Sequence, residues 1–416
     1  MEVPRTIYLN RLIKKRCNGS VKVITGIRRC GKSYLLFNLY YRYLLENNVP
    51  EDHIIKISLD DIINDELREP KTLYMFVKEQ VKDSEQYYLF LDEIQYVKNF
   101  SDLVNGLSHI KNIDIYITGS NSRFLSSDIL TEFRGRGDEI HINPLSFSEF
   151  CSVYKGTVNQ AWKDYYTFGG LPQILEREDE DKAEFLLSIA RKVYVSDIVE
   201  RHKVKHPAEL NDLLNILASS IGSLTNPTKL EKAFRSIKRS AITNKTISNY
   251  LNYFTESFLM EKACRFDVKG KRYIETPLKY YFSDLGIRNA LLNFRQQEEN
   301  HIMENIIFNE LKIRGYCVDV GVVGITEKDS NGKSQYKVLE IDFIASKGNQ
   351  KYYIQSAFDL PTAEKINQER RSLLKVNNSF KKIIVIKDDI KPKRDDYGIT
   401  TIGIFDFLLN ENSLEL

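Results

Sequence analysis

The most informative stretch in the first part of this chain is Val21-Lys-Val-Ile-Thr-Gly26-Ile-Arg-Arg-Cys-Gly31-Lys32-Ser33. It matches the pattern G-x-x-x-x-G-K-[S/T], with an apolar run before it and a helical pattern after it. The glycines allow the backbone to curl, so that successive N–H groups and a helix N-terminus face one anion. The stretch therefore predicts a phosphate-binding loop (P-loop) between a strand and a helix. The alternative is a glycine-rich turn that arose by chance.

The loop predicts ATP as the ligand, together with a magnesium ion. Lys32 is placed to reach the β- and γ-phosphates, and the hydroxyl of Ser33 is placed to ligate the metal. Backbone N–H groups along the loop would supply further phosphate contacts. The expected nucleotide-binding residues are Gly26, Ile27, Arg28, Arg29, Cys30, Gly31, Lys32, Ser33 and Tyr34.

A second apolar run, Tyr87-Tyr-Leu-Phe-Leu-Asp92-Glu93, ends in two carboxylates. Downstream of a P-loop, Asp92 is expected to hold the magnesium ion through its hydration shell. Glu93 is expected to accept a proton from the attacking water, because hydrolysis needs a positioned base beside the γ-phosphate. The alternative is a strand end capped by two solvated acids. The pair favours hydrolysis of ATP over binding alone.

Two further kinds of polar group are candidates for the hydrolytic site. Asn121 follows the strand predicted at 113–118 and would orient the water, although the same segment also suits a helix cap. Arg134 and Arg136 precede the next predicted strand and are candidates to neutralise charge in the transition state. They would act in cis or on a neighbouring subunit, and the second case requires a homo-oligomer. Surface salt bridges are the alternative role for the arginines.

Composition places the chain among ordinary globular proteins. Of its 416 residues, 42% are apolar and 28% are charged, and the net charge of +3 means that any nucleic-acid surface must be a local patch. The five cysteines form no C-x-x-C pair, which argues against a structural zinc site and a disulfide framework. The N-terminus lacks the apolar segment of a signal peptide, and no apolar run is long enough to span a membrane. We expect a cytoplasmic protein with no membrane contact.

Four segments follow from the hydrophobic patterns. Residues 1–150 alternate short apolar runs with helical stretches, which predicts an α/β domain around a mainly parallel sheet that closes near Pro144. Residues 151–205 predict a helical lid or linker. Residues 206–292 predict three helices and a hairpin, and residues 293–416 a second α/β domain. Strands of the first domain are expected at Val21–Thr25, His53–Leu59, Tyr87–Asp92, Ile113–Thr118 and Glu139–Ile142.

The middle segment is a candidate DNA-binding module. Its helices, expected at 209–221, 226–237 and 243–260, precede a hairpin with Gly270 at the turn. This order favours a winged helix whose third helix enters the major groove of double-stranded DNA. The alternative is a winged helix that packs against protein, with its charges solvated. Candidate contacts are Asn244, Lys245, Ser248 and Asn249, and the nearby basic residues are Lys229, Lys232, Arg235, Lys238 and Arg239.

Several of these motifs occur in a familiar order. The P-loop, Leu-Asp92-Glu93-Ile-Gln, Thr118-Gly-Ser-Asn-Ser, Arg134-Gly-Arg136 and Pro144-Leu-Ser-Phe-Ser-Glu-Phe together resemble a family of prokaryotic AAA+-like ATPases. The turn Phe168-Gly-Gly-Leu-Pro172 is similar to a signature of that family, whose C-terminal half has no assigned function. The resemblance covers nearly the whole chain. It implies the additional-strand class of P-loop ATPases, related to origin-recognition and STAND-type proteins, with a winged helix in the middle.

Residues 293–416 resemble the PD-(D/E)XK nuclease fold, in which a Glu, an Asp and an (E/Q)-x-K strand motif converge on one metal ion. Glu304, on a predicted helix, and Asp342, on a predicted strand, are the matching carboxylates. Oxygen ligands of this kind suit a second magnesium ion. The polar stretch Thr326–Ser334, before the strand with Asp342, predicts an exposed hairpin tip.

The nuclease-like strand motif departs from its pattern at one position. Gln355 matches, but Ala357 stands where the lysine should be. Because a methyl group can neither position water nor offset phosphate charge, the motif predicts a degenerate site over an active nuclease. Lys351 and Lys365 are the candidates to replace the missing lysine.

The sequence as a whole predicts an ATP-hydrolysing protein whose nucleotide state controls its engagement of DNA. The alternative is a signalling module, in which nucleotide state gates contact with an unknown protein partner and hydrolysis acts as a slow timer. DNA stimulation of ATP turnover would separate the two hypotheses. A residual metal-dependent nuclease is the third possibility.

Overall fold

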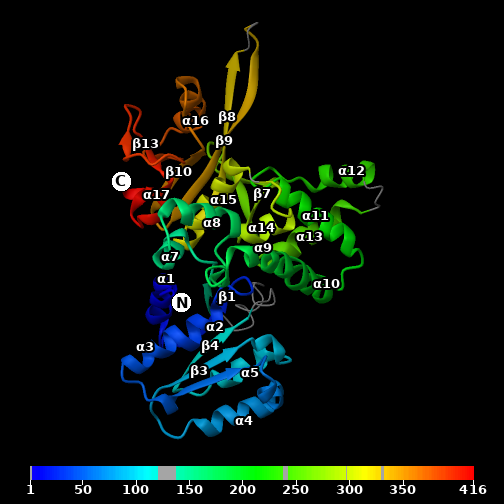
Figure 1. The fold of residues 1–416 in the computed structure, drawn as a ribbon, viewed down its shortest axis with the longest axis vertical. Coiled ribbons are helices and arrows are strands. Elements are labelled where there is room, and N and C mark those ends of the chain that lie inside the picture. The colour runs from blue at the N-terminus through cyan, green and yellow to red at the C-terminus, as the bar shows by residue number, and fades with distance from the viewer. Residues whose placement is uncertain (1, 120–136, 238–241, 297, 329–331) are drawn as a thin grey trace. The chain divides into compact units, whose positions relative to one another are not determined.

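A computed structural model describes residues 2–119, 137–237, 242–296, 298–328 and 332–416, and it divides into two compact units. The N-terminal unit consists of Met1–Pro144 together with Leu171–Gln173 and Glu256–Phe258. The C-terminal unit consists of Leu145–Gly170, Ile174–Thr255 and Leu259–Leu416. Each unit has its own β-sheet (Figure 1).

The N-terminal unit is built on a parallel sheet with the order β2-β3-β4-β1-β5. In this order β4 lies between β1 and β3. Because every strand runs in the same direction, the carboxyl ends of all five meet at one edge, where α/β sheets bind their ligands. The strands are β1 (Val21–Thr25), β2 (Ile54–Ser58), β3 (Tyr87–Asp92), β4 (Ile113–Thr118) and β5 (Gly137–His141).

Helices cover both faces of this sheet. Along β3, Leu89 and Leu91 pack into an apolar cluster with α4 and α5, while Phe90 faces Tyr40 with 5.8 Å between the ring centroids. This alternation is the period of a β-strand buried on both sides. The helices of the unit are α1 (Thr6–Lys15), α2 (Lys32–Tyr34), the π-helical stretch η1 (Leu35–Tyr40), α3 (Tyr41–Glu46), α4 (Pro70–Gln80) and α5 (Phe100–Leu107); short 3-10 turns occur at η2 (Glu51–His53), η3 (Ile62–Arg68) and η4 (Ile94–Tyr96).

A buried ion pair joins β1 to β4. The side chain of Lys22 is fully buried and donates to the carboxylate of Asp114, which is 4% exposed. Asp114 also accepts hydrogen bonds from the Tyr116 hydroxyl, at 2.7 Å, and from the backbone N–H of Cys17, at 2.8 Å. The carboxylate is therefore fully hydrogen-bonded, which a buried charge requires.

The C-terminal unit is built on a mixed sheet with the order β12-β13-β11-β10-β9-β8-β6-β7. The hairpin β6–β7 follows the three helices of the middle segment, and β6 also pairs in parallel with β8. The hairpin expected for a winged helix is therefore also an edge of the second sheet. The strands are β6 (Met260–Asp267), β7 (Arg272–Phe282), β8 (Cys317–Lys328), β9 (Ser334–Lys347), β10 (Gln350–Ala357), β11 (Lys381–Ile386), β12 (Lys393–Arg394) and β13 (Ile399–Gly403).

The helices of the C-terminal unit include the segment expected to be a lid. There, Trp162 of α8 packs edge-on against Phe147 of α7 and Phe405 of α17, with ring centroids 5.5 and 5.9 Å apart. The helices are α7 (Phe147–Val153), α8 (Val158–Phe168), α9 (Asp179–Ser188), α10 (Ser196–Arg201), α11 (Pro207–Ser219), α12 (Pro227–Ile237), α13 (Asn244–Glu256), α14 (Leu285–Leu291), α15 (Glu299–Ile313), α16 (Ala363–Leu374) and α17 (Ile404–Leu409), with a π-helical stretch η7 (Ile189–Val195) and a 3-10 turn η8 (Ser413–Glu415). The 3-10 turn η6 (Pro172–Ile174) begins in the N-terminal unit and ends at the first residue of the C-terminal one.

The hairpin β8–β9 is longer than its sequence predicts. The polar stretch Thr326–Ser334 lies at the end of this hairpin, as predicted, but the pairing extends into it, with Thr326 opposite Tyr336 and Lys328 opposite Ser334. Cross-strand hydrogen bonds continue the ladder through polar residues that alone indicate a turn. Local composition was the weaker signal here.

Replacing Asp114 by Asn is expected to destabilise the N-terminal unit by about 3–5 kcal/mol, because it leaves the buried ammonium of Lys22 without an opposite charge. The matched control is Asp138→Asn, since Asp138 pairs with Lys15 on a partly exposed surface, and its loss should be at most about 1 kcal/mol. Urea unfolding measures the loss of stability in both variants. Hydrogen exchange of the β1 and β4 amides measures the loss within this sheet. Equal losses of stability in the two variants would contradict the structural role of the buried Lys22–Asp114 ion pair.

Candidate functional site

The P-loop connects β1 to α2 in a backbone path that only glycine can follow at one end. Gly26 has φ 140°, and a Cβ built on it would lie 2.2 Å from the carbonyl oxygen of Ile142. Gly31, with φ 99°, immediately precedes α2. The thiol of Cys30 donates to the same Ile142 carbonyl at 3.3 Å. The loop is thus packed tightly against the residue that follows β5, which fixes its curvature.

The side chain of Lys32 is held by the backbone of the P-loop. Its ammonium donates to the carbonyl of Gly26 at 3.0 Å and to that of Ile27 at 3.2 Å, and the residue is 4% exposed. Pro172 lies next to the preceding loop residue, since a Cβ built on Gly31 would lie 3.9 Å from the Cγ of Pro172. The lysine is therefore positioned at the loop before any phosphate contact is made.

Asp92, at the carboxyl end of β3, lies against the P-loop serine. Its carboxylate accepts hydrogen bonds from the hydroxyls of Thr118 and Ser33, and the residue is 6% exposed. Burial raises the pKa of Asp92 above its ordinary value, although the two hydrogen bonds act in the opposite direction. The structure thus brings together the two residues that were predicted to act on magnesium. Their oxygen atoms are ligands of the type that magnesium prefers.

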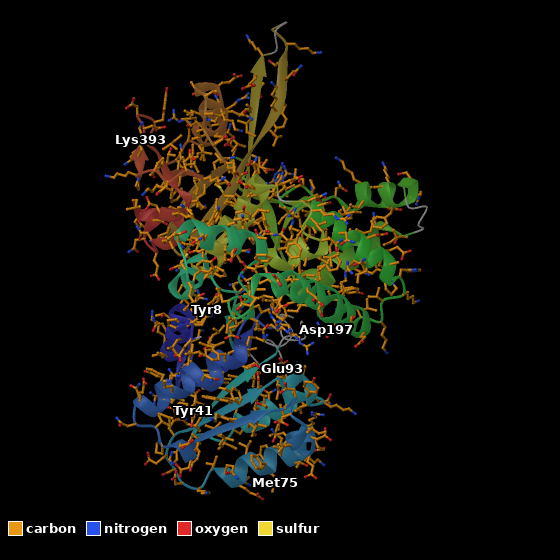
Figure 2. All side chains as sticks on the ribbon, in the orientation of Figure 1. Tyr8, Tyr41, Met75, Glu93, Asp197 and Lys393 are labelled. Atoms are coloured by element: carbon orange, nitrogen blue, oxygen red, sulfur yellow. The ribbon has the colours of Figure 1, made fainter. Side chains whose placement is uncertain are left out.

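Glu93 follows directly and lies at the same edge of the sheet (Figure 2). Its backbone is left-handed, with φ 51°, and its N–H donates to the Thr118 hydroxyl oxygen at 3.1 Å. Its carboxylate accepts a hydrogen bond from the side-chain amide of Gln95. The left-handed turn directs two successive carboxylates differently, so that Asp92 is buried and Glu93 is partly exposed.

Two residues of this site had no predicted role. Thr118 bridges Asp92 and the backbone of Glu93, and Gln95 holds the Glu93 carboxylate. A signal for Thr118 exists in the sequence, because it is the last residue of a strand that runs into Gly119. Its pairing with β3 depends on the strand order, which the sequence does not state.

Other predicted residues lie in different surroundings. Arg28, Arg29, Ser33 and Tyr34 are exposed at the loop, whereas Ile27 and Cys30 are buried beneath it. Asn121, Arg134 and Arg136 lie outside the described residues.

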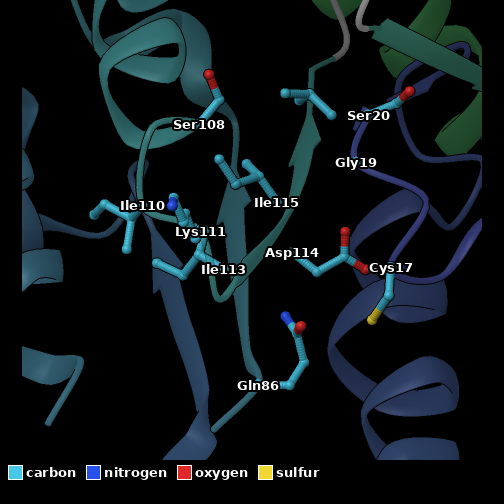
Figure 3. Close-up of a pocket in the computed structure, with 11 residues that line it drawn as sticks. Cys17, Gly19, Ser20, Gln86, Ser108, Ile110, Lys111, Ile113, Asp114 and Ile115 are labelled. Carbon is cyan, nitrogen blue, oxygen red and sulfur yellow. Dashed lines mark hydrogen bonds between the residues drawn. The ribbon is translucent and has the colours of Figure 1, made fainter. Parts of the chain in front are cut away.

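A pocket of about 140 Å³ lies at the opposite, amino-terminal edge of the same sheet (Figure 3). Its lining includes Cys17, Ser20, Gln86, Lys111 and Asp114. Asp114 in this lining already accepts hydrogen bonds from side chains of β1 and β4. The pocket therefore lies beside the structural Lys22–Asp114 ion pair. The nucleotide-binding motifs belong to the other edge.

The predicted second metal site is occupied by a lysine. Glu304 of α15 and Asp342 of β9 are each 9% exposed, and the ammonium of Lys279, from β7, lies 3.0 Å from Glu304 Oε1. The expected replacements lie elsewhere: Lys365 pairs with Glu369 at 2.7 Å, and Lys351 lies over the rings of Phe266 and Phe380. Both candidate lysines therefore have other partners in the structure.

The winged-helix candidate presents polar residues on the outer face of α13. Asn244, Lys245 and Asn249 are exposed, and the hydroxyl of Ser248 donates to the Asn244 carbonyl at 2.9 Å. On α12, Lys229, Lys232 and Arg235 are exposed, and Arg235 pairs with Glu231 at 3.0 Å. Lys238 and Arg239 lie outside the described residues. The buried face of α13 consists of Ile247, Tyr250, Leu251 and Phe254.

Comparison with known proteins gives two relatives of nearly the same length. An uncharacterized protein of Haemophilus influenzae is 33% identical over 98% of this chain and 98% of its own length. An uncharacterized protein of Methanocaldococcus jannaschii is 30% identical over 92% of this chain and 86% of its own length. This chain belongs to one family with them.

The first part of this chain is a P-loop domain of the AAA type. Residues 18–151 match an AAA domain, and residues 159–298 match a domain of unknown function (DUF8612). The second match spans the predicted helical segment and the winged-helix candidate as one domain. A solved structure, Drosophila ORC bound to AT-rich DNA and Cdc6, aligns over 70% of this chain and 92% of that chain with 10% identity and a TM-score of 0.23. Within the described residues, every helix is too short or too polar to cross a membrane.

Replacing Asp92 by Asn is expected to stabilise the nucleotide-free protein at neutral pH, because the amide carries no buried charge and its oxygen still accepts a hydrogen bond from a neighbouring hydroxyl. The folded-state pKa of Asp92 is raised, so the wild type loses stability as the pH rises from the unfolded value of about 3.9 through the folded-state value. The variant lacks this loss. Magnesium-dependent stabilisation by a non-hydrolysable ATP analogue should decrease in the same variant.

Thermal unfolding across the acid-to-neutral range, with and without the analogue, measures both effects. Asp60→Asn is the comparison variant: Asp60 is an exposed acid whose charge contributes to the raised pKa of Asp92, so its loss should stabilise the nucleotide-free protein by less than Asp92→Asn does. A less stable Asp92→Asn protein with an unchanged magnesium effect would contradict this account of the site.

Proposed function

We propose that this chain binds ATP with magnesium at the P-loop and hydrolyses it, with Glu93 as the general base. The observation that supports this proposal best is the position of Asp92. Its carboxylate lies between the hydroxyls of Ser33 and Thr118, and Glu93 is the next residue. A P-loop serine, a buried acid and a second, more accessible acid are the parts that ATP hydrolysis requires.

Each of these side chains has one task in the proposed reaction. Lys32 and the loop N–H groups bind the phosphates and offset their charge, while Ser33 and Asp92 hold magnesium, which supplies further charge neutralisation when bound. Glu93 takes a proton from the attacking water. Thr118 fixes the Asp92 carboxylate and the Glu93 backbone at once, so that the metal ligand and the base keep a constant spacing.

The residues after β4 complete the proposed site. Asn121 is proposed to orient the water, and Arg134 or Arg136 to neutralise charge on the transferred phosphoryl group. If an arginine acts on a neighbouring subunit, the active form is a homo-oligomer.

We further propose that the nucleotide state controls engagement of double-stranded DNA by the C-terminal unit. The observation behind this step is the set of exposed basic residues on α12, α13 and the β6–β7 hairpin. Four of them, Lys262, Lys269, Lys271 and Arg272, belong to the hairpin, and Lys245 lies at the start of α13. Exposed lysines and arginines of this kind, on a chain with a net charge of only +3, are the groups that would contact a phosphate backbone.

Replacing Glu93 by Gln is expected to lower ATP turnover by about 10²–10⁴-fold, because the water loses its base. ATP binding should be retained, since Glu93 contacts water rather than phosphate in this proposal. Lys32→Ala is the comparison variant, and it should weaken binding itself by about 10- to 150-fold, the effect of losing one charged hydrogen bond. Single-turnover hydrolysis and equilibrium binding of a fluorescent ATP analogue distinguish the two. Normal turnover in Glu93→Gln would exclude it as the base.

Replacing Lys229, Lys232 and Lys245 by Ala is expected to weaken DNA binding and its salt dependence. The slope of log K against log salt should fall by about 0.9 for each phosphate contact removed. Filter binding with and without ATP measures this change. Lys71→Ala with Lys78→Ala, both exposed on α4, is the control and should leave the slope unchanged. No measurable affinity for DNA or RNA at low salt would overturn the DNA step and favour a nucleotide-gated protein-interaction switch.

A further inference from the structure

Four charged side chains meet in the C-terminal unit at a place that the proposed ATP and DNA sites do not use. Lys279 comes from β7, Glu304 from α15, and Glu340 and Asp342 from β9. The ammonium of Lys279 lies 3.0 Å from Glu304 Oε1 and 2.8 Å from Glu340 Oε1. The Glu340 side chain keeps 32% of its surface exposed, whereas the Lys279 side chain keeps 5%. Lys279 is thus much more deeply buried than Glu340.

The positive charge of Lys279 is stabilised where it lies. Burial disfavours the charged ammonium, but attraction to Glu304, Asp342 and Glu340 is stronger and raises the pKa of Lys279 above its ordinary value. The group is therefore an ammonium at neutral pH. It gives the three acids a permanent cation that is part of the chain.

The remaining hydrogen-bonding capacity of the acids is met by protein groups. The Tyr281 hydroxyl donates to Glu304 Oε1 at 2.6 Å, and the backbone N–H of Ser356 donates to Asp342 Oδ2 at 2.8 Å. Burial and the charge of Glu304 raise the pKa of Asp342 well above its ordinary value, which favours a proton on that carboxyl.

The metal ion that the nuclease resemblance implies does not fit these residues. In the described part of the chain, no group of three His, Cys, Asp or Glu residues is arranged to hold a metal ion. A divalent ion held by Glu304 and Asp342 would also have to lie beside the Lys279 ammonium, which repels it. At the motif position, Ala357 is 2% exposed in an apolar cluster with Leu373 and Ile386, so that position has no room for a charge.

We propose that Lys279 is the resident cation of this carboxylate cluster and takes the place of the metal ion of a nuclease. The cluster is then a metal-independent internal salt bridge that joins β7, α15 and β9, and the C-terminal unit does not cleave nucleic acid. The cluster contains none of the residues of the proposed ATP and DNA sites, so its salt bridge does not depend on ATP hydrolysis or DNA binding.

The test uses the full chain without nucleotide, with Mn²⁺ as the probe. Wild-type protein should show no stoichiometric Mn²⁺ binding by calorimetry and no rise in Tm with Mn²⁺. Lys279→Met should lower Tm by roughly 5–15 °C, because it leaves buried acids without their cation, and Mn²⁺ should restore part of the loss. The restoration should disappear in Lys279→Met combined with Asp342→Asn. Lys262→Met, an exposed lysine of the same hairpin, should change none of these values.

Three results would overturn the proposal. The first is stoichiometric Mn²⁺ binding by wild-type protein that is lost in Asp342→Asn, which would show that a metal and the ammonium share the cluster. The second is a Lys279→Met protein of unchanged Tm, and the third is a destabilised one that Mn²⁺ does not restore. If Lys279→Met fails to fold, the wild-type binding measurement and a DNA-cleavage assay in Mn²⁺ decide alone, since cleavage that is lost in Asp342→Asn contradicts a metal-free site.

Discussion

The hydrogen bonds that hold Asp92 between the hydroxyls of Ser33 and Thr118 depend on one constraint, the order of three neighbouring strands. Ser33 follows β1, Asp92 ends β3 and Thr118 ends β4, and β4 lies between the other two. Parallel strands deliver their carboxyl ends to a single edge, so residues far apart in sequence arrive together without any long loop. The apolar alternation that packs helices on both faces is what keeps this edge rigid.

Much of the N-terminal unit could be predicted because its signals are local. The runs Val21–Thr25, Tyr87–Asp92 and Ile113–Thr118 are apolar, β-branched or aromatic, and they are strands over those same residues. The P-loop is equally local, since its glycines, its lysine and its serine are contiguous. The hairpin tip at Thr326–Ser334 was predicted from its polar composition, but the extent of the paired strands was not, because polar residues there still pair across the hairpin.

Contacts between distant elements could not be predicted. Lys279 precedes the strand with Asp342 by several elements, and nothing in its neighbourhood marks it as a partner of Glu304. The nuclease-like motif directed attention to lysines close to Ala357 in sequence, but a sheet can supply a charge from any strand or helix that reaches the same point. For Thr118, the sequence predicted the position at a strand end. It did not predict the contact with Asp92, because that contact depends on the strand order.

The route of the chain at Leu171–Gln173 has an implication for how such a protein can evolve. The chain leaves the C-terminal unit after Gly170, contributes Pro172 beside Gly31 of the P-loop, and returns at Ile174. Gly170 itself is fixed by the Asp284 carboxylate, which accepts its N–H at 2.8 Å. The N-terminal unit is therefore not encoded by one continuous stretch of gene. A single recombination event at Pro144 would separate the P-loop from Leu171–Gln173, which belong to its own unit.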